Sequence, residues 1–300
     1  MRPLRHRMIE DLQLRGYSDS TQSLYVNAVR RLCEHYNKCP GQITEEELRD
    51  YFLYGKNVKK WSRSTSTVAL CGIKFFYENT IERPWPTLLF IRPGREKKLP
   101  VVLSRDEVRQ TLSNLELLRY RVCLTTIYSC GLRLSEGTQL KVENIDSARG
   151  FIQVQKSKGH MGDKDRNVPL SKKTLQLLRE QWKSHKNKVW LFPAAGRNGQ
   201  QMRDATKPIS NSSVQSAFRK ALKSAGINKK ATVHTLRSRV THLLEAGTNP
   251  RVIQRYMGHT NLETTMAYFH LTRKGAEDAY AIINNLMKGF DHNNAQADPG

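Results

Sequence analysis

The stretch RPWPTLLFIRPGREKKLP, residues 83–100, divides the sequence into two parts of different character. It contains four prolines, one glycine and a cluster of charged residues. Proline lacks a backbone donor and restricts the residue before it, so this stretch is unsuited to a helix and predicts an extended linker. We therefore place a domain boundary here, which fits the roughly two domains expected of a chain of 300 residues.

Before the linker, the sequence predicts a bundle of short helices. YSDSTQSLYVNAVRRLCEHY, residues 17–36, opens with capping candidates and then repeats apolar residues at helical spacing. Residues 43–55 begin with a capping box, Thr44 with Glu47, and are expected to end at Gly55. Residues 62–82 supply a further helix with an apolar inner side.

After the linker, the pattern becomes mixed. A second capping box, Ser104 with Glu107, starts a predicted helical run that continues to Gly131. FIQVQ, residues 151–155, and RNVPL, residues 166–170, predict two short strands that flank a polar turn. The remainder is predicted to be helical, with stops at Gly226, Gly247 and Gly258. The predicted fold class is α+β and mostly helical, an N-terminal helical bundle followed by a mixed α/β domain with a small antiparallel sheet.

The charge balance restricts the class of partner. Lysine and arginine number 50 against 27 aspartates and glutamates, which gives a net charge of +23 and a pI near 10. Such an excess favours a polyanion, with nucleic acid first and an anionic membrane surface second. No apolar run approaches the ~20 residues that span a bilayer, and the N-terminal residues lack a signal core, so we expect a cytosolic protein. Five cysteines without CxxC spacing predict reduced packing thiols rather than disulfides or zinc.

Polar side chains suited to phosphate chemistry are scattered over four segments of the second domain. Each alone has an ordinary structural explanation: a surface arginine, a solvated turn lysine, a capping or core histidine, or a packing tyrosine. Their order along the chain makes the combination informative. The six candidates are Arg133, Lys158, His234, Arg237, His259 and Tyr268.

In that order, GLRLSE, KSKG, HTLR, MGH and TTMAY closely resemble the boxes of the tyrosine recombinases, also called the phage integrase family. The resemblance covers nearly the whole chain and is strongest to integron integrases and Xer recombinases. It implies a SAM-like, core-binding helical domain at residues 1–90 and a linker at 91–103. It also implies a catalytic domain at 104–290 and a disordered tail at 291–300. Together the two domains would form a C-shaped clamp on double-stranded DNA.

The chemistry of this family explains the two arginines and the tyrosine. Attack of a phenol on a backbone phosphate passes through a phosphorane with extra negative charge on its nonbridging oxygens, which guanidinium groups bind well. By resemblance, Arg133 and Arg237 are these clamps and Tyr268 is the nucleophile. Tyr256 and Tyr280 are the nearest alternative tyrosines.

The remaining candidates concern proton transfer. Free tyrosine has a pKa of ~10, so an attacking phenol needs help in losing its proton. By resemblance, His234 and His259 assist the phosphate and proton transfers, and Lys158 donates a proton to the departing 5′ oxygen as general acid. Lys156 is the alternative lysine. Because a phosphotyrosyl bond conserves the energy of the broken phosphodiester, we expect no nucleotide, metal or other cofactor.

One departure from the family pattern lies directly after HTLR. Only Ser238, Arg239 and Val240 precede THLLEAG, where the family usually has four residues. Since one residue turns a helix by about 100°, the deletion would either be absorbed before the helix or displace Arg237. We expect absorption, which would leave Arg239 as a dispensable charge on the helix surface.

Three functions fit this sequence. The first is a site-specific recombinase or integrase of a mobile element in a prokaryotic host, acting near the nucleoid as a homotetramer on two DNA sites. An apolar helical face at residues 279–287 favours it, because such a helix could pass to a neighbouring subunit. The second is a type IB topoisomerase-like nicking and closing enzyme. The third is a recombinase-like DNA-binding protein impaired by the deletion.

Overall fold

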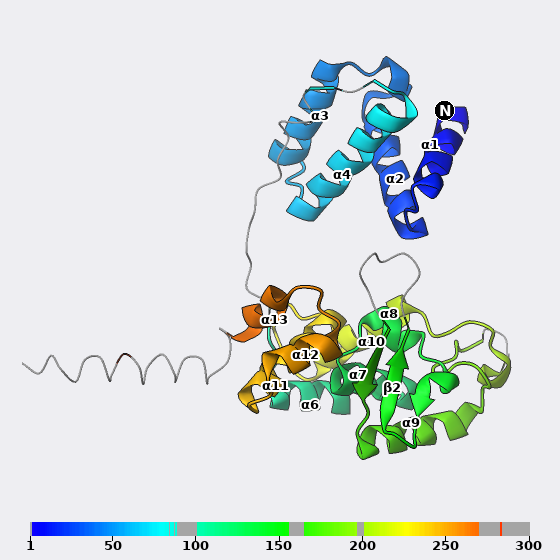
Figure 1. Ribbon diagram of the computed structural model, residues 1–300, viewed down its shortest axis with the longest axis vertical. Helices are drawn as coiled ribbons and strands as arrows, with labels where there is room; N and C mark the ends of the chain where they lie inside the picture. The colour runs from blue at the N-terminus through cyan, green and yellow to red at the C-terminus, as the bar shows by residue number, and fades with distance from the viewer. Residues whose placement is uncertain are drawn as a thin grey trace, which may run out of the picture. The chain divides into compact units, whose positions relative to one another are not determined.

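The computed structural model describes residues 2–83, 85–86, 88, 101–155, 165–196, 201–269 and 283. The chain divides into two compact units, one formed by residues before 99 and the other by residues from 99 onward, leaving aside residues 157–161, which are not described. The described elements are helices in the first unit, and helices around a small sheet in the second (Figure 1). The predicted fold class is therefore confirmed.

In the described part of the first unit, polar caps fix the start of three helices. The side chains of Ser18, Thr44 and Ser62 each accept a hydrogen bond from a backbone N–H in the first turn that follows. The capping box predicted for Thr44 and Glu47 is confirmed. The elements are α1 (Arg2–Leu14), α2 (Asp19–Tyr36), η1 (Pro40–Gln42), α3 (Glu45–Asn57), α4 (Arg63–Phe75) and the π-helical turn η2 (Phe76–Thr80).

Two glycines of this unit allow close packing. The expected helix stop at Gly55 is wrong, because α3 continues to Asn57. A Cβ at Gly55 would lie 2.4 Å from the ring of Trp61, so this position accommodates an aromatic side chain instead of ending the helix. A Cβ at Gly72 of α4 would lie 2.9 Å from the Cα of Tyr25, which explains how α2 and α4 pack closely.

The second unit contains more helices than the sequence predicted. The capping box of Ser104 and Glu107 is confirmed. The single helical run expected from there to Gly131 is wrong, because residues 114–117 divide it into two helices, α6 and α7. The elements are α6 (Arg105–Ser113), α7 (Leu118–Cys130), α8 (Leu134–Thr138), η3 (Val142–Asn144), β1 (Ile145–Asp146), β2 (Phe151–Val154), β3 (Arg166–Pro169), α9 (Lys172–His185), η4 (Met202–Asp204), α10 (Asn211–Ser224), η5 (Val233–Ser238), α11 (Arg239–Glu245), α12 (Pro250–Met257) and α13 (Leu262–Phe269).

The sheet of this unit is antiparallel in the order β1-β2-β3. Both predicted strands are present within one residue of their expected ends, and the two-residue strand β1 was missed because it is too short to show a period. Ile152 pairs with Val168, and both are buried against the core. Val154 pairs with Arg166 at one end of this strand pair, and residues 156–164, where the sequence predicts a polar turn, lie outside the described residues.

Helix α7 is the centre of this unit. Its buried residues, which include Val122, Leu124 and Ile127, point in several directions, and the helix packs against α6, α8, α9, α10 and η5. A helix that is apolar on most sides is expected to be surrounded by other elements. It ends at Gly131, whose φ of 64° and close contact with Met257 admit no side chain. The end of α7 therefore lies beside the end of α12, where the candidate residues meet.

The five cysteines are all free, which agrees with the expected thiols, although Cys39 is exposed and does not pack in the core. Among the described helices, none has the length and apolar character needed to cross a membrane.

Candidate active site

Arg133 stands at the N-terminus of α8, immediately after the turn that ends α7. Its Nη1 donates to Oε1 of Glu136 at 2.9 Å, and its Nη2 donates to the carbonyl oxygen of Gly258 at 3.0 Å. The side chain remains 30% exposed. The guanidinium is thus held between two elements far apart in sequence while one part of it still reaches solvent.

Glu136 is the anion at the centre of this arrangement. Arg166 of β3 grips it with two hydrogen bonds, Nη1 to Oε1 at 3.0 Å and Nη2 to Oε2 at 2.7 Å. The two side chains are only 8% and 6% exposed. Burial raises the pKa of Glu136, but the hydrogen bonds and charge of Arg166, with those of Arg133, outweigh it and hold the pKa below its usual value. The carboxylate is therefore ionised and orients both arginines.

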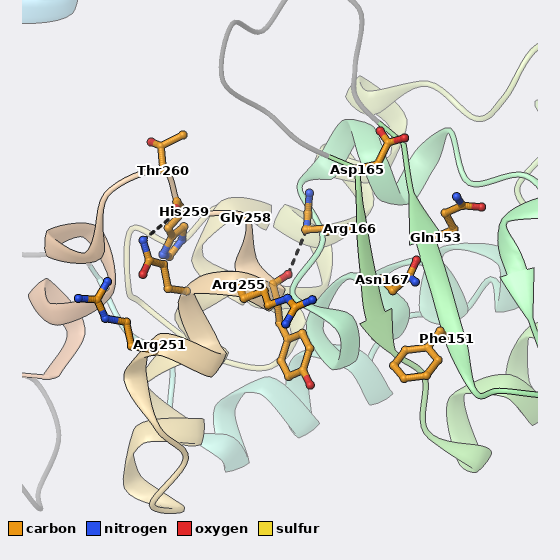
Figure 2. Close-up of a pocket in the computed structure, with 12 residues that line it drawn as sticks. Phe151, Gln153, Asp165, Arg166, Asn167, Arg251, Arg255, Gly258, His259 and Thr260 are labelled. Atoms are coloured by element: carbon orange, nitrogen blue, oxygen red, sulfur yellow. Dashed lines mark hydrogen bonds between the residues drawn. The ribbon is translucent and has the colours of Figure 1, made fainter.

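Arg166 also joins β3 to α12. Its Nε donates to the carbonyl oxygen of Tyr256 at 3.0 Å, a bond that is visible in Figure 2. A Cβ at Gly258 would lie 3.0 Å from Nη1 of Arg166, and Gly258 has a φ of 62°. Glycine is therefore favoured there by both the backbone conformation and the guanidinium that packs on it.

Arg237 brings a third guanidinium to the same place. It lies in η5, is 3% exposed, and donates from Nη2 to the carbonyl oxygen of Met257 at 2.6 Å. Its Nη1 is buried and has no hydrogen-bond partner among the described residues. Burial and then the charge of Arg133 lower the pKa of Arg237 to about 10, so the group stays charged at neutral pH. A buried cation with a free donor is suited to binding an anionic oxygen.

The segment around HTLR, where one residue is missing relative to the family pattern, does not continue the α-helix that follows it. Residues Val233–Ser238 form a 3₁₀ helix, and α11 begins only at Arg239. A 3₁₀ helix has 3.0 residues per turn instead of 3.6, so its side chains are spaced differently around the axis. Arg237 lies close enough to Arg133 for the two charges to interact, as we expected if the deletion is absorbed before the helix.

The expectation that Arg239 is a charge on the helix surface is wrong. Its side chain is partly buried, and its charge interacts with Cys130 and Tyr128 of α7. Burial is the larger effect and lowers the pKa of Arg239 below its usual value. The first turn of α11 faces the centre of the unit here, which a count of helical positions could not reveal.

The two candidate histidines lie within the field of these cations. His234 is the second residue of η5, is exposed at the surface, and has a pKa lowered by partial desolvation and then by Arg237 and Arg133. His259 follows the end of α12 and is partly buried, with Nδ1 located 2.9 Å from the hydroxyl oxygen of Thr265. Burial, followed by Arg237 and Arg133, lowers the pKa of His259 to about 4. This histidine is neutral at physiological pH.

Tyr268 lies in α13 and packs, partly buried, against the apolar cluster that contains Leu244, Ile253 and Met257. Burial raises the pKa of its phenol, and the nearby charge of Arg237 opposes that effect without cancelling it. The interaction with Arg237 places Tyr268 in the neighbourhood of the arginine cluster. The phenol is therefore protonated before any reaction.

An open pocket of about 950 Å³ adjoins this cluster (Figure 2). One wall comes from β2 and β3 and the other from α12 and the turn that follows it. Arg251 and Arg255 of α12 line the pocket together with Arg166, and Asp165 is its acidic lining residue. The pocket offers a cationic surface of a size suited to a polyanion. Within the described ranges, no group of three or more His, Cys, Asp or Glu side chains could hold a metal ion.

The structure thus brings four of the six candidates, Arg133, His234, His259 and Tyr268, within electrostatic range of a fifth, Arg237. The sixth, Lys158, lies outside the described residues, as do Lys156 and Tyr280. Tyr256 contributes its backbone carbonyl to Arg166.

Sequence reasoning missed Glu136, Arg166 and Thr265. A carboxylate three residues after Arg133 was a visible signal for the first, because that spacing places both side chains on one helix face. Arg166 had a weaker signal, a charged residue on the same strand face as the buried Val168. Thr265 had none, because its importance depends on what it contacts.

We expect Arg166→Met to destabilise the second unit by about 3–5 kcal/mol, because it leaves a buried carboxylate without its bidentate partner. Urea-induced unfolding followed by tryptophan fluorescence measures the change. Arg149→Met is the matched control, since Arg149 is 83% exposed and its distance to Asp146 is 3.9 Å, so its unfolding curve should match that of the wild type. Equal stability of the two variants would show that the Arg166–Glu136 pair does not hold these elements together.

Comparison with known proteins assigns both parts of the chain to one group. Residues 101–274 match the Phage integrase family, and residues 4–87 match the N-terminal SAM-like domain of phage integrases. A Sinorhizobium fredii protein whose name describes it as an integrase/recombinase is 39% identical over 273 residues, covering 90% of this chain and 85% of the relative.

Two further comparisons agree with this assignment. Tyrosine recombinase XerA of Pyrococcus horikoshii is 36% identical over 202 residues, covering 66% of this chain and 67% of the relative. A crystal structure of a lambda integrase dimer bound to a core site has the same fold, with a TM-score of 0.68 at 17% identity, covering 89% of this chain and 94% of that one. This chain therefore belongs to the phage integrase family and is a tyrosine-type site-specific recombinase.

Proposed function

We propose that this recombinase cuts and rejoins double-stranded DNA at specific sites of a mobile genetic element through a covalent 3′-phosphotyrosyl intermediate. The observation that carries the proposal is the buried guanidinium of Arg237, whose Nη1 has no partner among the described residues and whose charge interacts with those of Arg133 and Tyr268. A phosphate has the charge and the oxygens to satisfy that donor. The net charge of +23 supports a DNA partner for the same reason.

In the proposed reaction, Tyr268 attacks the phosphorus while Arg133 and Arg237 hold the nonbridging oxygens. The new bond joins the phenol oxygen to phosphorus, and the bond from phosphorus to the 5′ oxygen breaks. Glu136 keeps the guanidinium of Arg133 in place and is already ionised, so it takes no part in proton transfer. The two guanidiniums are fixed before the substrate arrives, so they need little reorganisation during the reaction. They therefore stabilise the negative charge that develops on the phosphate in the transition state and lower the activation free energy.

Two residues are proposed to transfer protons, His234 and Lys158, while His259 assists at the phosphate. His234 is exposed next to the cations and neutral at physiological pH, so it can accept the proton that Tyr268 loses. Lys158 is proposed as the general acid for the 5′ oxygen, with Lys156 as the alternative, and both lie outside the described residues.

The domain roles follow the same proposal. Residues 1–90 would bind DNA as the core-binding domain, residues 91–103 would link, and residues 104–290 would carry the catalysis, with a tail at 291–300. The matched ranges 4–87 and 101–274 support this division. The lambda integrase structure contains a core site, and we propose duplex DNA as the partner here too. Assembly as a homotetramer through the apolar face at residues 279–287, and action at the nucleoid of a prokaryotic cell, complete the proposal.

Covalent trapping on DNA tests this function. The chain is incubated with duplexes from the flanks of its own gene that carry a nick near the candidate site, so that a cleaved fragment diffuses away. We expect an adduct that survives denaturing electrophoresis, with the DNA joined through its 3′ phosphate to Tyr268 in a mass-mapped peptide. Recombinant products from two intact sites distinguish strand exchange from mere nicking and closing. Duplex binding without an adduct on any flank sequence would refute the proposal.

A further inference from the structure

The hydroxyl of Thr265 is fully buried in α13 and lies 2.9 Å from Nδ1 of His259. The histidine is fixed on its other side as well. Its backbone N–H donates to the carbonyl oxygen of Gln254 at 3.1 Å, and its carbonyl accepts from Nε2 of Gln254 at 3.2 Å (Figure 2). The ring is therefore held between α12 and α13, with Nδ1 directed at Thr265.

The hydroxyl of Thr265 differs from those of Thr111 and Thr126, two other buried helical threonines. Thr111 and Thr126 donate to the carbonyl oxygen four residues earlier, at 2.7 Å and 2.8 Å. Among the described residues, the hydrogen-bond partner of the Thr265 hydroxyl is Nδ1 of His259 alone. An unsatisfied buried donor is costly, so we expect the hydroxyl of Thr265 to place its proton on an acceptor. Nδ1 is the acceptor available, so it cannot carry a proton itself.

The charges around His259 keep the ring neutral. Arg237 and His234 face it from η5, Arg133 from α8 and Arg166 from β3, while Arg251 and Arg255 of α12 and Asp165 line the adjoining pocket; Tyr268 lies on α13. Protonation would add another positive charge to a cationic cluster, and the pKa of His259, lowered by burial and these arginines to about 4, reflects that cost. A neutral imidazole has one N–H, and with Nδ1 occupied as acceptor it must be on Nε2.

We propose that Thr265 is a positioning residue that holds neutral His259 as its Nε2–H tautomer, so that His259 donates a hydrogen bond to a phosphate oxygen instead of accepting a proton from Tyr268. The phosphate as hydrogen-bond acceptor rests on the proposed function. The tautomer of His259 does not depend on that function. It divides the work of the two histidines: His259 supplies an N–H without adding charge, and His234 is left as the acceptor for the phenolic proton.

Nuclear magnetic resonance of the full chain tests the tautomer directly. With ¹⁵N-labelled histidine, two-bond ¹⁵N–¹H correlations distinguish Nε2–H from Nδ1–H, and His259→Gln identifies the signal among the nine histidines. We expect the wild type and Thr265→Ser to show Nε2–H, and Thr265→Val to show a population of Nδ1–H. A wild-type spectrum with Nδ1–H overturns the proposal, and this reading holds whether or not the chain cleaves any DNA.

Single-turnover cleavage tests the role. We expect Thr265→Val to cleave DNA about tenfold more slowly than the wild type near neutral pH, because it loses one hydrogen bond. Thr265→Ser keeps the hydroxyl and should cleave at the wild-type rate. As the pH falls toward the pKa of His259, the deficit of Thr265→Val should shrink, because a protonated ring carries N–H on both nitrogens. Thr264→Val, an exposed neighbour on the same helix, is the matched control and should cut at the wild-type rate.

The outcomes separate the possible failures. A deficit that is the same at every pH, or that Thr265→Ser does not relieve, would mean that Thr265 only packs, and would overturn the positioning role. If Thr265→Val does not fold, the wild-type and Thr265→Ser spectra still decide the tautomer. If the wild type forms no covalent adduct, the proposed function fails while the tautomer remains tested by resonance alone.

Discussion

Tyr268→Phe is expected to bind DNA as the wild type does and to form no covalent adduct. The substitution removes only the phenol oxygen, and phenylalanine keeps the packing of the ring against Leu244, Ile253 and Met257. Removal of an attacking nucleophile costs on the order of 10⁶ in rate, so the adduct should fall below detection. Binding measured by electrophoretic mobility shift and adduct measured by denaturing electrophoresis on the same duplex report the two properties separately.

Tyr120→Phe is the matched control for this substitution. Tyr120 packs partly buried against the core of the same unit and is not among the candidate residues, so its loss of a hydroxyl should leave the adduct unchanged. Any adduct that Tyr268→Phe still forms would be mapped by mass spectrometry. Cleavage at the wild-type rate through Tyr256 or Tyr280 would disprove the assignment of the nucleophile.

Arg237→Lys has the second largest expected effect, a fall in cleavage rate of about 10²–10³-fold, as for the loss of one preorganised donor in a transition state. The ammonium group cannot both bond to the Met257 carbonyl and present a second planar donor to a phosphate. Burial adds to the loss, because it lowers the pKa of a lysine from ~10.4 and favours the neutral amine. Single-turnover cleavage at saturating protein isolates this step from DNA binding.

Arg179→Lys, an exposed change on α9, should leave the rate unaltered and controls for the substitution itself. Insertion of one residue between Ser238 and Arg239 completes the experiment. Since η5 already places Arg237 beside Arg133, we expect the insertion to slow cleavage by displacing α11. A faster insertion variant, or an Arg237→Lys variant with wild-type cleavage, would show that Arg237 is not the second clamp.

Local sequence signals were reliable where local chemistry decides the structure. Ser104 and Glu107 form their capping box because the two groups satisfy each other's backbone donors within one turn. Gly131, Gly226, Gly247 and Gly258 have positive φ, as expected of helix stops. The alternation in FIQV is reproduced by its burial pattern. Gly55 is an exception. Inside α3, it leaves room for the ring of Trp61, and the helix continues past it.

The order of the boxes from GLRLSE to TTMAY identified the candidates, but it could not say how they meet. Arg133 and the Gly258 carbonyl are 125 residues apart in sequence and 3.0 Å apart in the structure. Packing of α7 against the elements around it creates that proximity, and no local pattern encodes it. Arg239 is a second example. Counting helical positions predicts that its side chain lies on the surface, but in the fold it is partly buried against α7.

The sequence by itself therefore determined most of the elements, the excess of positive charge and the residue types available for phosphate chemistry, because these depend on neighbours within a turn or on composition. Only the tertiary structure decided which charges are paired and which are free. Glu136 is ionised by two arginines from different elements, Arg237 keeps a buried donor without a partner among the described residues, and His259 is neutral with Nδ1 directed at Thr265. The physical reason is that burial and long-range contact set the protonation and orientation of a polar group, and both arise only when distant segments pack together.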